Sequence, residues 1–192
     1  MGRATRKLMK RREQGPRFLT FSCFRRLQLF SNAAIRDVFL DALYTTRAKF
    51  GFSLYAWVVM PEHVHLLLET PAEDTVAAAL LSMKVSTSMK VLRRWKTLHA
   101  PVLSHIVGPS GRPLFWQPGG GFDRNVRDED TLARHIQYIH RNPVERGLVA
   151  KPEDWAWSSV RWWDGDHTAR VCDPPPGDSR RWDHWIAAGG YK

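Results

Sequence analysis

Two histidines at a spacing of two, His63 and His65, are the first residues whose types and positions suggest chemistry. Alternate side chains of a β-strand share a face, so both imidazoles would project together and could share one cation. Glu62 precedes the pair, and its carboxylate could add a hard oxygen ligand, although a residue of a surface turn is the simpler interpretation. An isolated HxH motif is weak evidence, because a structural role for such histidines is more common.

A second group of polar side chains lies in the sequence RHIQYIHRNP, which has helical periodicity. Tyr138 and Asn142 are four residues apart and His135 lies three before Tyr138, so a helix would place them on one side. The apolar stripe of this helix consists of Leu132, Ile136 and Ile139. The tyrosine side lies roughly a quarter-turn from that stripe, where a phenol can reach a cleft or simply be a hydrogen-bonded boundary aromatic. Pro143 predicts that the helix ends near Asn142.

The two groups together could perform nucleophilic chemistry on a phosphodiester. A tyrosine hydroxyl ionises only at about pH 10 and is a poor nucleophile at neutral pH. A divalent ion held by two imidazoles and a side-chain oxygen can polarise a phosphate, orient it and stabilise the charge that develops during in-line attack. A phosphotyrosine bond retains the energy of the broken phosphodiester, so a DNA hydroxyl can reverse the step without a nucleotide cofactor. This chemistry suits strand transfer better than degradation.

The composition favours a polyanionic partner. The 192 residues include 29 Lys and Arg against 19 Asp and Glu, which gives a formal net charge of +10. Nine Trp residues suit single-stranded nucleic acid, where bases stack and phosphates attract cations. No run of about 18 apolar residues and no signal-peptide core are present, so we expect a cytoplasmic, DNA-associated protein with no membrane partner. Cys23 and Cys172 indicate neither a disulfide framework nor a thiolate zinc site.

The order of the predicted elements indicates an α+β fold. Apolar patterns predict strands at residues 17–24, 52–60, 64–69 and 114–116. Helices are expected between an N-cap at Ser31 and Gly51, over residues 74–96, and after an N-cap at Asp128. A flexible turn is expected at Gly119–Gly121. This order predicts a ferredoxin-like sandwich, a largely antiparallel sheet with helices packed on one face.

Basic residues outside the two polar groups are candidate DNA contacts. We expect one domain over residues 17–163, a basic, flexible arm over 1–16 and a Pro- and Trp-containing tail over 164–192. The arm and the second predicted helix would bind the phosphate backbone electrostatically. The candidate DNA-binding residues are Arg11, Arg12, Lys84, Lys90, Arg93, Arg94, Arg124, Arg134 and Arg141.

Four segments of the chain resemble the REP-associated tyrosine transposases, a branch of the one-tyrosine HUH superfamily related to the small insertion-sequence transposases. These segments are AWVVMPEHVHLLLE at 56–69, FWQPGGGFDRNVRDED at 115–130, HIQYIHRNPVERGLV at 135–149 and WAWSSVRWW from Trp155. Their order is that of the family, and the resemblance covers roughly residues 17–163. It implies a ferredoxin-like sheet with the histidine pair on a central strand and the tyrosine on a helix.

The resemblance also implies residue roles. The implied metal ligands are His63, His65 and Asn142. Tyr138 would be the nucleophile, with His135 and Glu62 as candidate assistants and Mg or Mn as the working ion. Two departures from the family pattern are Glu62, where Asn is common, and the glycine-rich approach to Phe122.

The function predicted from these residues is transposition of single-stranded hairpin DNA, with strands cleaved and rejoined through a covalent 5′-phosphotyrosine. Two alternatives are open: a domesticated nucleic-acid-binding module without catalysis, and a metal-dependent nuclease in which Tyr138 only positions substrate and water attacks phosphate. Relatives differ in assembly, so the family resemblance is compatible with both a monomer and a homodimer.

Overall fold

The computed structural model describes residues 15–72, 75–119, 121–166, 168 and 170–191. Within them the chain forms a four-stranded sheet in the order β2-β3-β1-β4, with every neighbouring pair antiparallel. The strands are β1 (Arg17–Ser22), β2 (Ser53–Val59), β3 (His63–Glu69) and β4 (Phe122–Asn125). The helices of eight or more residues are α1 (Ala33–Phe50), α2 (Thr75–Thr97), α3 (Glu129–Glu145) and α5 (Ser179–Ala187). This order confirms the α+β, ferredoxin-like prediction.

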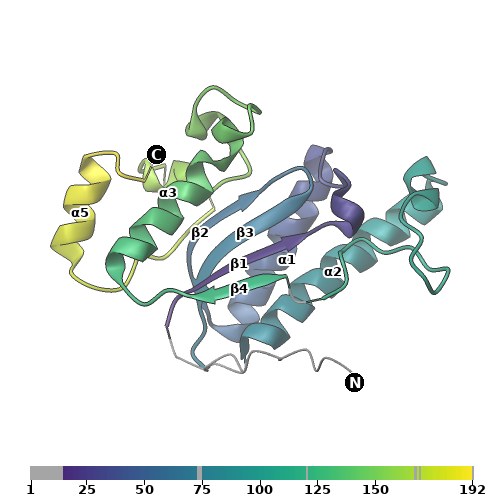
Figure 1. Ribbon diagram of the computed structural model, residues 1–192, viewed down its shortest axis with the longest axis horizontal. Coiled ribbons are helices and arrows are strands. Elements are labelled where there is room, and N and C mark those ends of the chain that lie inside the picture. The colour runs from purple at the N-terminus through teal and green to yellow at the C-terminus, as the bar shows by residue number, and fades with distance from the viewer. Residues whose placement is uncertain (1–14, 73–74, 120, 167, 169, 192) are drawn as a thin grey trace, which may run out of the picture.

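Helices α1 and α2 cover one face of the sheet (Figure 1). Leu19 and Leu66 project from the sheet into this layer, where Phe39 of α1 and Met83 of α2 are fully buried. By length and composition α2 could cross a membrane, with an 18-residue window of mean hydropathy 1.2, but core helices also meet this criterion. One side of α2, with Val76, Ala79 and Met83, packs against α1 and the sheet, whereas Leu81, Val85 and Met89 are exposed on its outer side.

Helix α3 lies on the opposite face of the sheet, so the expectation of helices on one face describes α1 and α2 alone (Figure 1). Ile136 and Ile139 of α3 are fully buried with Phe18 and Leu67 of the sheet, which confirms the predicted apolar stripe. The short helix α4 (Val160–Trp163) and α5 add Trp side chains to the same layer. This second core occupies only part of its face, and the remainder forms the pocket described below.

The ends of two helices follow local signals in the sequence. Asn32, not Ser31, caps α1: its side chain accepts a hydrogen bond from the backbone of Ala34 at 2.8 Å. Gly51 ends the helix in the left-handed conformation with φ 64°, as predicted. Asp128 caps α3, also as predicted, by accepting from the backbone of Thr131 at 2.7 Å.

Two predicted boundaries are wrong. Residues 114–116 form no regular strand: Trp116 makes an isolated antiparallel bridge with Cys23, and Phe115 and Trp116 are buried in the core. The fourth strand is β4, whose half-exposed edge position requires no apolar run. Helix α3 continues through Pro143 to Glu145, so Asn142 lies inside the last turn. Proline lacks an N–H, but the backbone of Arg146 still donates to the carbonyl of Asn142 at 3.1 Å.

The outer edge of β2 is covered by the C-terminal part of the chain. Val59 donates to the carbonyl of Trp157, and Ser159 donates to the carbonyl of Trp57, both at 2.9 Å. Further along, the Asp173 backbone donates to the Leu54 carbonyl at 2.8 Å. The described residues of the predicted tail over 164–192 pack on the domain, and Trp182 and Tyr191 are buried in the layer that contains α3.

Candidate active site

The histidine pair lies on β3, one of the two central strands, on the face that α3 only partly covers. His65 is paired with Thr20 and His63 with Ser22 in the register of β1 and β3. Both imidazoles project from the same face, as the spacing predicts, and their Nε2 atoms lie 2.9 Å apart. Both side chains are mostly buried, and both line the pocket described below.

Each imidazole is oriented through its other ring nitrogen. Nδ1 of His65 lies 2.7 Å from the Thr20 hydroxyl, and Nδ1 of His63 lies 3.1 Å from Oε1 of Glu62. With Nδ1 protonated and donating to these oxygens, each Nε2 lone pair is free to bind a cation. Burial, with the nearby charges of His63 and Arg26, lowers the pKa of His65 to about 3, so this ring is neutral at physiological pH.

Glu62 lies in the predicted turn between β2 and β3, but the turn is buried and not on the surface. It is the last of the three residues between β2 and β3, yet it is only 4% exposed, because the segment after β1 covers the turn. Its Oε1 accepts from Arg146 at 2.8 Å as well as contacting Nδ1 of His63. Burial opposes ionisation, but His63 and Arg146 lower the pKa of Glu62 overall. Glu62 is therefore an ionised partner that orients His63 from the side of Nδ1.

Asn142 approaches the same space from α3. Its amide nitrogen lies 3.5 Å from Nε2 of His65, and its Oδ1 is buried without a hydrogen-bond partner. The two ends of an amide are assigned from their surroundings, and a half-turn of this amide would direct the oxygen toward the histidine pair. Two neutral imidazoles and one unpartnered amide oxygen fit a divalent cation that keeps positions for water or phosphate. No described group of three or more His, Cys, Asp or Glu side chains offers an alternative cluster.

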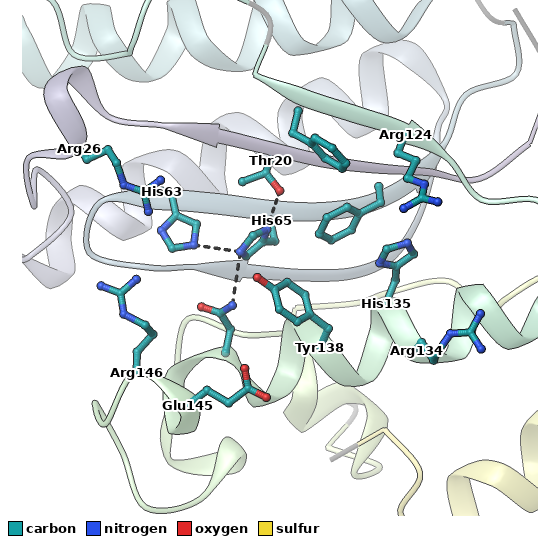
Figure 2. A pocket seen from close by; sticks show the side chains of 13 residues that line it. Thr20, Arg26, His63, His65, Arg124, Arg134, His135, Tyr138, Glu145 and Arg146 are labelled. Atoms are coloured by element: carbon teal, nitrogen blue, oxygen red, sulfur yellow. Dashed lines mark hydrogen bonds between the residues drawn. The ribbon is translucent and has the colours of Figure 1, made fainter. Parts of the chain in front are cut away.

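Tyr138 stands one helical turn from Asn142, beside the core, as predicted. Its ring centroid lies 5.2 Å from that of His65, with the rings nearly perpendicular at 74°. Figure 2 shows the Tyr138 hydroxyl directed toward His65. The side chain is 42% exposed, so a substrate can reach it.

His135 is brought into the pocket but not into the histidine pair. Its ring stacks on Phe18 with centroids 4.3 Å apart and an interplanar angle of 9°. Burial, together with Arg124 and Arg134, lowers its pKa, and its Nε2 has no hydrogen-bond partner. A neutral imidazole at this position extends the aromatic wall of the pocket.

The side chains named above line one open pocket of about 770 Å³. Its lining residues are Phe18, Thr20, Arg26, His63, His65, Phe122, Arg124, Arg134, His135, Tyr138, Asn142, Glu145 and Arg146. The four arginines surround a mouth that contains only one carboxylate, Glu145, besides the buried Glu62 behind it. The pocket suits an anionic substrate.

The predicted DNA-binding residues are divided among several places. Arg124 and Arg134 line the pocket, whereas Arg141 is exposed beside it and pairs with Glu145 at 3.8 Å. Lys84, Lys90, Arg93 and Arg94 lie on α2, on the other side of the sheet. Lys84 donates to the Gly119 carbonyl at 3.2 Å, and burial lowers its pKa. Arg11 and Arg12 lie outside the described residues.

Several pocket residues were not predicted from the sequence. Thr20 and Phe18 precede the histidines by more than forty positions and reach them only through strand pairing. Arg26 and Arg146 both form an ion pair with Oε1 of Glu62. The nitrogen–oxygen distances are 3.7 Å for Arg26 and 2.8 Å for Arg146. The period-two alternation of β1 could have identified Phe18 and Thr20 as sharing a face, but not which face.

Residues 18–142 match the family model of IS200-like transposases. The chain belongs to this family. The match begins in β1 and ends at Asn142, so it includes the sheet, the histidine pair and the tyrosine helix.

Two relatives of this family member are REP-associated tyrosine transposases by name. A protein assigned as one in Haemophilus influenzae is 26% identical over 122 residues, which are 63% of this chain and 66% of the relative. The Escherichia coli protein is 30% identical over 108 residues, 56% of this chain and 54% of the relative. The matches thus span about half to two thirds of these relatives' lengths.

The fold is also that of a solved relative. A REP-associated tyrosine transposase bound to a REP hairpin superposes with a TM-score of 0.62 at 23% sequence identity. The superposition covers 87% of this chain and 90% of that one. The likeness extends over nearly the whole fold, including segments beyond the family match.

Proposed function

We propose that this protein cleaves and rejoins single-stranded DNA beside a hairpin, with Tyr138 as the nucleophile. The observation that carries the proposal is the meeting of the two Nε2 atoms, 2.9 Å apart, with the Tyr138 ring 5.2 Å from His65 in one arginine-lined pocket. A structural role for the histidines would not require an exposed phenol directed at them. The family membership supports DNA as the substrate.

His63, His65 and Asn142 would hold Mg or Mn, which when bound would polarise the scissile phosphate and stabilise its developing charge. Tyr138 would attack the phosphorus: a bond forms between its Oη and phosphorus, and the bond from phosphorus to the 3′-oxygen breaks. The phenol gives up its proton, and the departing 3′-oxygen takes one up. Attack by a DNA 3′-hydroxyl reverses both changes and rejoins the strand, without a nucleotide cofactor.

Hairpin DNA is proposed as the form of substrate because a relative of the same fold holds a REP hairpin. The formal net charge of +10 would support binding of the duplex stem through its phosphates, while the pocket receives an unpaired flank. Because the two named relatives are bacterial, we propose that the protein acts on DNA in the bacterial cytoplasm.

The test uses a hairpin with single-stranded flanks, labelled at its 3′ end, incubated with the protein and Mg or Mn and separated under denaturing conditions. A 5′-phosphotyrosine bond keeps the 3′ portion of the strand, so the label should move with the protein. Tyr138→Phe should abolish this band and leave hairpin affinity within about twofold. Tyr44→Phe is the matched control, since Tyr44 does not line the pocket and its hydroxyl donates to the Val171 carbonyl at 3.0 Å.

Each other outcome identifies an alternative. Cleavage that leaves free 5′-phosphate ends and persists in Tyr138→Phe would assign the reaction to water and make the protein a hydrolytic nuclease. Hairpin binding without cleavage across varied flanks and both metals would favour a non-catalytic binding module. An adduct that survives in Tyr138→Phe would remove Tyr138 from the mechanism.

A further inference from the structure

Phe122 is an exposed aromatic side chain at the rim of the pocket, with 53% of its surface accessible. It is the first residue of β4, and the alternation of this strand places Phe122 and Arg124 toward the pocket. Asp123 points to the other face, where Arg17 binds its carboxylate through two hydrogen bonds of 2.9 Å. The orientation of β4 is thus fixed, and the exposure of Phe122 follows from a well-anchored strand.

A row of rings connects Phe122 with the tyrosine. Phe18 lies at its centre: its centroid is 6.1 Å from that of Phe122, 6.0 Å from that of Tyr138 and 4.3 Å from that of His135. Phe18 is buried and His135 is half-buried, whereas Phe122 and Tyr138 are the exposed ends of the row. Core packing accounts for Phe18 but gives no reason for a large apolar ring at the Phe122 position.

The surroundings of Phe122 are cationic. Arg124 shares its strand face, and Arg134 lines the same pocket from α3 (Figure 2). Burial and the charges of both arginines lower the pKa of His135, the ring that stacks on Phe18. An exposed ring that shares a pocket with two guanidinium groups suits unpaired nucleotides, since the ring can stack on a base and the cations attract phosphate.

We propose that Phe122, Arg124 and Arg134 form a subsite for one unpaired DNA nucleotide that flanks the cleavage site. The base stacks on Phe122, and the arginines bind the adjoining phosphates. Phe122 pairs with Thr20 across β4 and β1, and Thr20 pairs with His65 across β1 and β3. Two strand spacings are about 10 Å, within the span of a few nucleotides, so one strand can occupy this subsite and the tyrosine together.

The subsite rests on the proposed function for its substrate, but binding can be measured without cleavage. Tyr138→Phe protein is titrated, without metal, into a fluorescent hairpin bearing a single-stranded flank, and anisotropy gives the affinity. Adding Phe122→Ala should weaken binding by roughly 5- to 150-fold, the range expected for one stacked base. Phe122→Trp, which keeps an aromatic face, should retain most of the affinity. Leu81→Ala is the control, because Leu81 is 64% exposed on α2 behind the sheet.

An abasic scan of the flank then identifies the stacked nucleotide. At one position of the flank, removal of the base should weaken DNA binding by the Tyr138→Phe protein as much as the Phe122→Ala substitution does. The abasic site and the substitution together should reduce the affinity no more than either alone. Additive losses at every position, or an unchanged affinity in Phe122→Ala, would overturn the subsite. Thermal melting of each variant separates lost stacking from lost folding. A missing covalent adduct with an intact abasic signature would instead reject the tyrosine chemistry and retain the subsite.

Discussion

At the scale of single residues, the histidine pair depends on the groups behind it. Thr20 and Glu62 each contact an Nδ1 atom, and Arg146 in turn binds Glu62. Such outer contacts set the tautomer and direction of a metal-binding imidazole. Glu62 is an ionised carboxylate in this role, which gives His63 a stronger acceptor than a neutral amide at that position would.

Replacing Glu62 by Gln should therefore weaken metal binding. The glutamine can still accept from His63, but it loses the charge that attracts the imidazole N–H and pairs with Arg146. We expect Mn affinity, measured by isothermal titration on the protein without DNA, to fall roughly 10- to 100-fold. Glu69→Gln is the matched control on β3, since Glu69 accepts from the Tyr55 hydroxyl at 2.6 Å, away from the pair. Equal affinities in the two variants would mean that Glu62 does not orient the ligand.

At the scale of elements, β4 must lie close to β1 to present Phe122 and Arg124. Gly121 makes this approach possible: its φ is 77°, and a Cβ at this position would overlap the Thr20 carbonyl oxygen. The glycine-rich run that departs from the family pattern thus has a steric reason at its last residue.

Gly121→Ala should displace the start of β4. We expect a loss of stability of about 1–3 kcal/mol, from the positive φ and the overlap together, in denaturant unfolding. Hairpin affinity should fall as well, because Phe122 follows directly. Gly111→Ala is the comparison: its φ of 73° is similar, but nothing lies within 4 Å of the place that its new methyl group would take. If both variants lose the same stability, backbone strain alone explains the effect.

Sequence patterns predicted the elements whose signals are local. The spacing of His63 and His65, the stripe of α3 and the caps at Gly51 and Asp128 each depend on residues close in sequence. β4 was not predicted, because this edge strand of four residues has no apolar run. The strand was predicted instead at the apolar run that contains Phe115 and Trp116, which are core residues. The role of Glu62 escaped because its burial results from chain segments that pack over the turn, which no local pattern encodes.

At the scale of the whole molecule, one buried histidine joins the tyrosine helix to the C-terminal segment. His140 of α3 is fully buried, with Nε2 2.8 Å from the Ser159 hydroxyl and Nδ1 2.8 Å from the Tyr191 carbonyl. Burial lowers its pKa to about 4, although the Tyr191 carbonyl and Asp164 act in the opposite direction. The neutral ring is thus part of what holds α3 against β2 and the segments after it.

This burial predicts that stability falls in mild acid. In the unfolded chain a histidine has a pKa of about 6.5, whereas the pKa of His140 in the folded chain is about 4. Between these two pH values the unfolded chain is protonated at His140 and the folded chain is not. The free energy of unfolding should decrease across this window by an amount on the order of 3 kcal/mol from His140. His140→Gln should flatten the decrease in melting temperature between pH 7 and 4.5, whereas exposed His184→Gln should not. Parallel pH curves for all three proteins would contradict the assignment.

The two faces of β3 have a consequence for how sequences of this kind can diverge. The side chains of Val64, Leu66 and Leu68 are buried in the core beneath α1 and α2. Those of His63 and His65 line the pocket on the other face. Six of the seven residues are buried, so the strand has almost no position at which substitutions could accumulate without effect. Mutational tolerance is instead expected at exposed positions, among them the outer surfaces of α1 and α2. Substitutions there can change solubility, charge and partners without disturbing the strand that holds the histidine pair.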